Sequence, residues 1–233
     1  MVNHTLPVSS GTSLPPGTAP RGPRRGSRLA EWSDVRDELK QRLFWRIGRE
    51  LRLAGRILDL GCGAPDLHRY LAKTYRQRVT GVETALGELT ARRDCSPGGL
   101  VRCIRGVASR LHYFVRDSSK DAVVMMWTLH RAKQPLRVLE EAYRVLRPGG
   151  EIVIVDFLQG AAAERLCRVD YFRPEEVRGL LKKTAFCDTD VQLIEQEQII
   201  WARGFRPPES PLDAAARPDL QRAARLSEFP ETT

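Results

Sequence analysis

Large apolar residues recur along the chain at the spacing that marks the buried face of a helix. The first such stripe predicts a helix from about Ser33, with its apolar positions running from Trp32 to Leu51 at intervals of three and four residues. Further helices are expected over residues 66–75, 85–93, 136–146 and 174–185. Pro148-Gly149-Gly150 marks the end of the helix before it, because this tripeptide cannot continue a helical turn.

Short runs rich in branched apolar residues predict the strands between these helices. They are Arg56–Leu60, Arg78–Val82, Leu100–Ile104, Asp121–Trp127, Glu151–Asp156, Val191–Glu195 and Ile199–Arg203. The fourth run is apolar on both faces, as expected of a central parallel strand. Alternating strands and helices indicate a parallel sheet covered on both faces. We therefore expect an α/β fold: a Rossmann-like, doubly wound, mostly parallel sheet of seven strands that ends in a C-terminal antiparallel hairpin.

Composition divides the chain into three parts. Residues 1–30 form a basic tail rich in Pro and Gly that is expected to be disordered, residues 31–205 carry the sheet pattern, and residues 206–233 form a Pro-rich tail. Five dispersed cysteines without a CxxC pair predict a reducing, cytoplasmic setting. The chain has no run of about 20 apolar residues, so we expect no membrane span.

The net charge of +9 has two interpretations. It is consistent with an anionic partner such as RNA or a phosphorylated metabolite. It is also what solvated faces with many arginines produce. We favour the second interpretation, because acidic residues lie between the basic ones everywhere except in the N-terminal arm. Nucleic acid is thus a less favoured partner than a small molecule.

The strongest chemical signal is a glycine turn after the first strand. Gly61-Cys62-Gly63 lets the backbone approach a ligand closely, and the helix that follows offers free N–H groups. Glu83 ends the second strand, where a doubly wound sheet places a carboxylate that accepts hydrogen bonds from ribose hydroxyls. These residues predict a site for an adenosine-containing cofactor, and by themselves they also fit NAD.

Several segments resemble the class I S-adenosylmethionine-dependent methyltransferases. Residues 57–63 are similar to motif I of that superfamily, residues 117–130 to its strand-four motif, and residues 143–156 to its Arg-Pro-Gly-Gly turn and fifth strand. Residues 172–186 resemble the late helix of the methyltransferase type 11 branch, which includes quinone-biosynthesis enzymes. The resemblance implies S-adenosylmethionine as the cofactor and a small molecule as the methyl acceptor.

The resemblance also implies roles for five residues. Asp59, Gly61 and Gly63 would line the methionine and ribose part of the cofactor, and Glu83 would hold the ribose. Trp127 would form the floor of the pocket below the sulfonium, since an aromatic ring stabilises a nearby cation. A purely structural position at the end of a buried strand is an equal alternative for Trp127.

Two positions depart from the pattern of the superfamily. Pro65 stands where glycine is frequent, and it supplies one N–H fewer to the turn. Val107 stands where an aspartate receives the adenine amine, so Ser109 or a backbone carbonyl would have to replace that aspartate. These departures motivate a second hypothesis, a degenerate domain that binds or regulates without catalysis.

Methyl transfer needs alignment more than it needs a catalytic motif. The methyl carbon is already activated, and a base is required only if the acceptor must lose a proton. His130, just beyond the fourth strand, is our candidate base, with His112 and Tyr113 as alternatives and Tyr171 as a residue that closes the pocket. The four histidines are dispersed, so no metal site is expected. An RNA-directed methyltransferase and an NAD dehydrogenase remain the other functional hypotheses.

Overall fold

The computed structural model describes residues 25–63, 66–83, 99–167 and 169–209. It contains two compact units, residues 1–42 and residues 43–233. Helix α1 (Arg25–Glu50) spans the boundary between them and begins before Ser33, where the apolar stripe placed its start. The helix begins earlier because the segment Arg25–Ala30 contains Arg, Leu and Ala. These residues favour a helix even though they lie outside the apolar stripe. The helix expected over 85–93, and most of both expected tails, lie outside the described residues.

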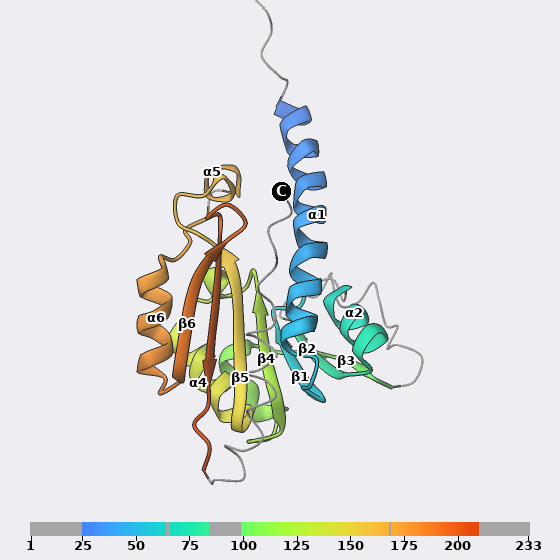
Figure 1. Ribbon diagram of the computed structural model, residues 1–233, viewed down its shortest axis with the longest axis vertical. Helices are drawn as coiled ribbons and strands as arrows, with labels where there is room; N and C mark the ends of the chain where they lie inside the picture. The colour runs from blue at the N-terminus through green and yellow to red at the C-terminus, as the bar shows by residue number, and fades with distance from the viewer. Residues whose placement is uncertain (1–24, 64–65, 84–98, 168, 210–233) are drawn as a thin grey trace, which may run out of the picture. The chain divides into compact units, whose positions relative to one another are not determined.

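The second unit is built on a seven-stranded sheet (Figure 1). Its strands are β1 (Arg56–Leu60), β2 (Arg78–Glu83), β3 (Val101–Arg105), β4 (Lys120–Met126), β5 (Leu146–Phe157), β6 (Cys187–Ile194) and β7 (Ile199–Phe205). Their order is β3-β2-β1-β4-β5-β7-β6, and the first five run parallel. Strand β7 is antiparallel to both β5 and β6. The predicted mostly parallel sheet with a C-terminal antiparallel hairpin is therefore confirmed.

Helices and short 3-10 turns connect these strands. They are α2 (Asp66–Tyr75), η1 (Ala108–Tyr113), η2 (Leu129–Arg131), α4 (Pro135–Val145), α5 (Ala162–Cys167) and α6 (Pro174–Lys183). Proline opens both α4 and α6, at a position where its missing N–H costs nothing. The sequence pattern did not predict η1, η2 or α5, because these elements are too short to show a helical period. None of the described helices is both long and apolar enough to cross a membrane.

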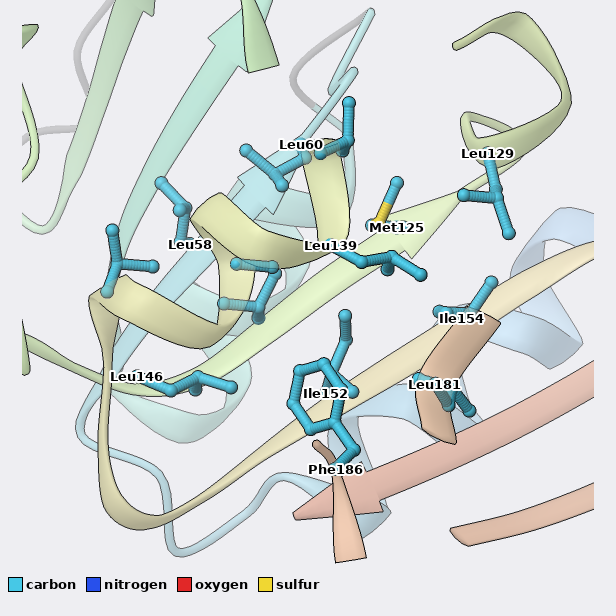
Figure 2. Packing of buried hydrophobic residues seen from close by; sticks show 14 of the residues in the cluster. Leu58, Leu60, Met125, Leu129, Leu139, Leu146, Ile152, Ile154, Leu181 and Phe186 are labelled. Atoms are coloured by element: carbon cyan, nitrogen blue, oxygen red, sulfur yellow. The ribbon is translucent and has the colours of Figure 1, made fainter. Parts of the chain in front are cut away.

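The main hydrophobic core lies between the sheet and the helices α4 and α6 (Figure 2). Side chains of β1, β4 and β5 meet the two helices there, with no exposed surface on the following residues: Leu58, Leu60, Met125, Leu139, Ile152, Ile154 and Leu181. Alternation along β1 sends Leu58 and Leu60 to this face, while Ile57 and Asp59 point to the opposite face. Both faces of β1 are thus buried, as its position in the middle of the sheet requires.

Two strands are longer than their sequences suggested. Strand β5 begins at Leu146, which already pairs with Lys120 before an irregularity in the register. Two backbone hydrogen bonds hold the Pro-Gly-Gly segment against Arg206. The N–H of Gly149 donates to the carbonyl of Arg206 at 3.0 Å, and the N–H of Arg206 donates to the carbonyl of Gly150 at 2.8 Å. Strand β6 begins at Cys187 rather than Val191, because its pairing with β7 continues through polar positions that hide the strand pattern.

Replacing a core leucine tests the packing of α4 on the sheet. Leu139→Ala is expected to lower the free energy of unfolding by about 2–5 kcal/mol, because it leaves a cavity in a core without exposed surface. Leu53→Ala is the control, since that side chain is 53% exposed and its loss should change the free energy by less than about 0.5 kcal/mol. Urea denaturation of both variants measures the difference, and equal stabilities would contradict the core assignment.

Candidate functional site

A cavity of about 650 Å³ opens at the carboxyl ends of the parallel strands. Its described wall comes from Gly61 after β1, the end of β2, residues 106–110 after β3, Thr128 and residues 131–134 after β4, and Val138 of α4. Strands β1 and β4 are neighbours whose connections leave in opposite directions, which makes this the topological switch point of the sheet. The volume lies within the range of roughly 300–1,000 Å³ typical of small-molecule sites.

The glycine turn forms one wall of this cavity. Gly61 has a φ of +70°, and a Cβ atom there would lie 2.4 Å from Oγ1 of Thr128, so only glycine fits. The N–H groups of Gly61 and Cys62 both donate to the carbonyl of Val82, at 2.8 and 3.4 Å, which ties the turn to β2. The backbone is therefore bare and held in place where it meets the cavity.

Glu83 stands opposite this turn at the end of β2. Its Oε2 accepts a hydrogen bond of 3.0 Å from the N–H of Gly63, and its carbonyl accepts one of 3.0 Å from Gly106. The side chain is 3% exposed, yet it forms part of the cavity wall. The structure thus brings Gly61, Gly63 and Glu83 together, as the offset between them in the sequence suggested. Their contact with a cofactor stays a prediction.

Asp59 lies elsewhere, against helix α2. Its Oδ2 is 2.8 Å from Nε2 of His68, and both side chains are buried. The two groups are close enough for an ion pair, but the geometry at Nε2 is not that of a regular hydrogen bond to a described residue. Asp59 is not part of the described cavity wall. Its position in β1 turns the side chain to the α2 face, and its expected place beside the methionine part of the cofactor stays a prediction.

His68 is the residue that the sequence analysis missed in this region. It lies on the buried face of α2, and its ring covers Gly81, where a Cβ would lie 2.0 Å from Cε1. Burial lowers the pKa of His68, but contacts with Asp59, Cys103 and Cys62 outweigh it and raise the pKa well above its ordinary value. His68 stands between apolar neighbours at helical spacing, which was the signal for a buried position.

The cavity wall after β3 carries one of the departures noted in the sequence, Val107. Val107 and Ser109 both line the wall, so the hydroxyl of Ser109 is available where Val107 offers no polar atom. Three cationic side chains, Arg110, Arg131 and Lys133, also line the cavity. These three cations outnumber the carboxylate of the described wall, Glu83. The described wall is therefore electropositive. Pro65 lies outside the described residues.

A buried carboxylate holds His130 at the ends of β4 and β5. Nδ1 of His130 lies 2.7 Å from Oδ1 of Asp156, and the backbone N–H of His130 donates to Oδ2 at 3.0 Å. The exposed fractions of the two side chains are 8% and 1%. Oδ1 also accepts a 3.0 Å hydrogen bond from the N–H of Phe157. The ring of His130 is therefore fixed in orientation, and its second nitrogen has no hydrogen bond to a described residue.

The rings of Trp127, Phe157, Tyr171 and His130 form a continuous ring wall. Trp127 stacks on Phe157 with centroids 5.5 Å apart and planes at 10°, Phe157 meets Tyr171 edge-on at 5.5 Å, and Tyr171 lies 4.5 Å from the ring of His130. Trp127 has a φ of +55°, a conformation that costs about 1–3 kcal/mol in a bulky residue. Its side chain belongs to this wall and not to the described wall of the cavity.

None of the candidate bases, His130 included, lines the described wall of the cavity, although His130 directly precedes Arg131, which does. His112 contacts Glu141, with 3.6 Å between Nδ1 and Oε2, and Tyr113 is 74% exposed. Neither contributes to the described wall. Among the residues that the structure describes, no group of three or more His, Cys, Asp or Glu side chains is arranged to hold a metal ion.

Asp156 and Phe157 are further site residues that the sequence analysis did not identify. Asp156 was read only as the end of the fifth strand. The rule that found Glu83, a carboxylate at the carboxyl end of a parallel strand, applies to Asp156 as well. The signal was thus present, but its partner His130 is distant in the sequence, and only the pairing of β4 with β5 places them together.

The pH dependence of stability tests the buried contact of His68. Because the pKa of His68 is raised in the folded state, its stabilisation is fully present below about pH 6.5 and is lost as the pH rises through the folded-state pKa. His68→Gln should therefore flatten the decline of the unfolding free energy above neutral pH. Denaturation at a series of pH values measures this slope, with the exposed His112→Gln as control. Parallel slopes in wild type and His68→Gln would refute the raised pKa.

Comparison with known proteins finds similarity to methyltransferases. Residues 58–154 match the family model of the methyltransferase domain. The chain is 31% identical over 110 residues to 27-O-demethylrifamycin SV methyltransferase of Amycolatopsis mediterranei, covering 46% of this chain and 40% of the relative. It is 30% identical over 122 residues to a ubiquinone/menaquinone biosynthesis C-methyltransferase of Syntrophotalea carbinolica, covering 49% and 51%. The chain thus spans about half the length of these relatives.

A solved structure with the same fold supports the assignment of the sheet. An S-adenosylmethionine-dependent methyltransferase from Archaeoglobus fulgidus superposes with a TM-score of 0.61 at 15% identity, covering 72% of this chain and 93% of that one. At this identity the likeness shows the fold alone. The domain match over residues 58–154 and these relatives support a class I S-adenosylmethionine-dependent methyltransferase.

Proposed function

We propose that this chain transfers a methyl group from S-adenosylmethionine to a hydroxyl oxygen of a small-molecule acceptor, with His130 as the general base. The observation that carries the proposal is the contact of 2.7 Å between His130 and the buried Asp156 at the carboxyl ends of β4 and β5. A histidine oriented in this way by a carboxylate is poised for proton transfer. It lies one residue from Arg131, which lines the cavity.

The domain type implies S-adenosylmethionine as the cofactor. The site fits it, because Gly61 lines the cavity without a side chain and Glu83 offers a carboxylate to ribose hydroxyls. The carboxylate of Glu83 would hold the cofactor, while the N–H groups of the turn, which donate to Val82 and Glu83, keep the backbone in place beside it. When bound, it supplies a methyl group on a sulfonium, which is already electrophilic.

The protein then has to position the acceptor and remove its proton. Asp156 accepts the Nδ1 proton of His130, which leaves the lone pair on Nε2 to receive a proton from the acceptor hydroxyl as its oxygen attacks. Asp156 is a positioning residue in this scheme, because it acts through His130. The aromatic rings of Phe157 and Tyr171 keep water from the buried side of the imidazole.

The relatives support a small-molecule acceptor, since their names refer to a rifamycin and to quinone biosynthesis. RNA is a second candidate acceptor. The observation in its favour is the electropositive mouth of the cavity, formed by Arg110, Arg131 and Lys133. Retention of RNA that weakens steeply with salt would support that alternative. A degenerate, non-catalytic domain is the third reading, and it rests on Val107.

Calorimetry with S-adenosylhomocysteine tests the cofactor site. Glu83→Gln keeps an acceptor for the N–H of Gly63 but removes the charge, and it is expected to weaken binding about 10- to 100-fold, since hydrogen bonds to charged groups contribute most. Glu140→Gln on the surface of α4 is the matched control and should bind as wild type does. An unchanged affinity in Glu83→Gln would remove the ribose assignment, and no binding by wild type would favour the degenerate domain.

The base is tested by transfer of tritiated methyl from S-adenosylmethionine into a bacterial small-molecule extract. His130→Gln is expected to lower kcat roughly 10²- to 10⁴-fold while the dissociation constant of S-adenosylhomocysteine stays the same. Asp156→Asn should shift the pH profile of kcat, because the amide no longer stabilises the protonated ring. The exposed His112→Gln serves as control. Full activity in His130→Gln would exclude the base role.

A further inference from the structure

We propose that Trp127 determines acceptor specificity: its indole N–H binds a second oxygen of the acceptor while His130 takes the proton from the reacting hydroxyl. This inference rests on the proposed function and deepens it by naming the class of acceptor. The class comprises molecules in which a hydrogen-bond-accepting oxygen stands near the methylated hydroxyl, such as vicinal diols, catechols and α-hydroxyketones.

The indole nitrogen of Trp127 is a buried donor without a hydrogen-bond partner among the described residues. Buried polar groups in proteins nearly always have a partner, so an exception calls for an explanation. An indole N–H only donates, and its partner must therefore be an acceptor atom such as a carbonyl, hydroxyl or carboxylate oxygen. An ammonium group is excluded as the partner on the same ground.

The backbone of Trp127 is held in an unfavourable conformation. Its φ is +55°, although the residue directly follows a strand and carries a bulky side chain. The backbone N–H of Trp127 donates to the carbonyl of Val155 at 2.7 Å, which fixes this conformation against β5. Strain of this kind persists where the surrounding structure enforces it, and it is concentrated at ligand sites. The geometry thus holds the indole in one place instead of letting it relax.

The ring wall places Trp127 on the acceptor side of the site. The indole stacks on Phe157 of β5, and Phe157 leads through Tyr171 to the ring of His130. The cofactor features, Gly61 and Glu83, lie instead at the ends of β1 and β2. Since β4 separates β1 from β5 in the sheet, the indole belongs with the base and not with the ribose carboxylate.

Trp127→Phe is the variant that isolates the N–H, because it keeps an aromatic ring against Phe157. The extract assay described above first identifies the methylated compound by mass spectrometry. With that compound, Trp127→Phe should raise KM about 5- to 10-fold, as expected for the loss of one hydrogen bond, with kcat within about twofold of wild type. The dissociation constant of S-adenosylhomocysteine should not change. Trp45→Phe is the matched control, since Trp45 lies on α1 and is 40% exposed.

Each outcome of this experiment is informative. An unchanged KM in a folded Trp127→Phe would make Trp127 merely structural, and a weaker affinity for S-adenosylhomocysteine would assign its N–H to the cofactor; both overturn the inference. An identified acceptor with only one oxygen would also overturn it, while leaving the proposed function intact. Failure of wild type to bind S-adenosylhomocysteine or to transfer methyl would instead defeat the proposed function, and this inference with it.

Discussion

The parallel pairing of β1 with β4 is the constraint on which the site depends. Ile57, Leu58 and Asp59 pair with Ala122, Val123 and Val124, and the chain leaves the two strands toward opposite edges of the sheet. The segments that follow β1 and β4 therefore diverge, and the cavity opens between them. The core under α4 keeps these strands in place, because Leu58, Leu60 and Met125 have no exposed surface.

The two sides of this switch point carry different chemistry. On the side of β1 and β2, Glu83 provides a carboxylate suited to the hydroxyl groups of a nucleoside, beside a glycine turn that its own hydrogen bonds hold in place. On the side of β4 and β5, the Asp156–His130 pair and its neighbouring rings offer a base and a flat, mostly apolar surface. A reaction that joins a nucleoside-bearing donor to a separate acceptor needs this division, since each partner must be held while their reacting atoms meet.

Three buried carboxylates in the described part of the sheet are paired with cationic or titratable side chains. Asp59 contacts His68, Asp156 contacts His130, and Glu151 contacts Arg203 at 2.8 Å. Burial raises the pKa of Glu151, and Arg203 opposes that shift. Breaking such a pair is costly because it leaves one buried charge uncompensated. The Asp156–His130 pair differs from the Asp59–His68 pair in that one nitrogen of its histidine has no hydrogen bond to a described residue, whereas both nitrogens of His68 have contacts.

The periodicity of apolar residues was sufficient to predict the class of fold, because a parallel sheet requires strands that are apolar on both faces and helices with one apolar stripe. It did not predict η1, η2 or α5, which are too short to show a period, or the early part of β6, where polar residues alternate on an edge strand. It also did not predict that β5 begins at Leu146, because this residue fits the apolar stripe of the preceding helix.

The sequence by itself determined the residues that are tied to a local conformation: the glycine turn, which needs positive φ, and Glu83, whose offset follows from one strand–helix–strand unit. Only the tertiary structure decided that Asp59 faces His68, that Asp156 holds His130, and that Trp127 lies against Phe157. The direction of a strand side chain depends on which elements cover each face, and contacts between β4 and β5 join residues far apart in the chain. Neither is encoded in the spacing of neighbouring residues.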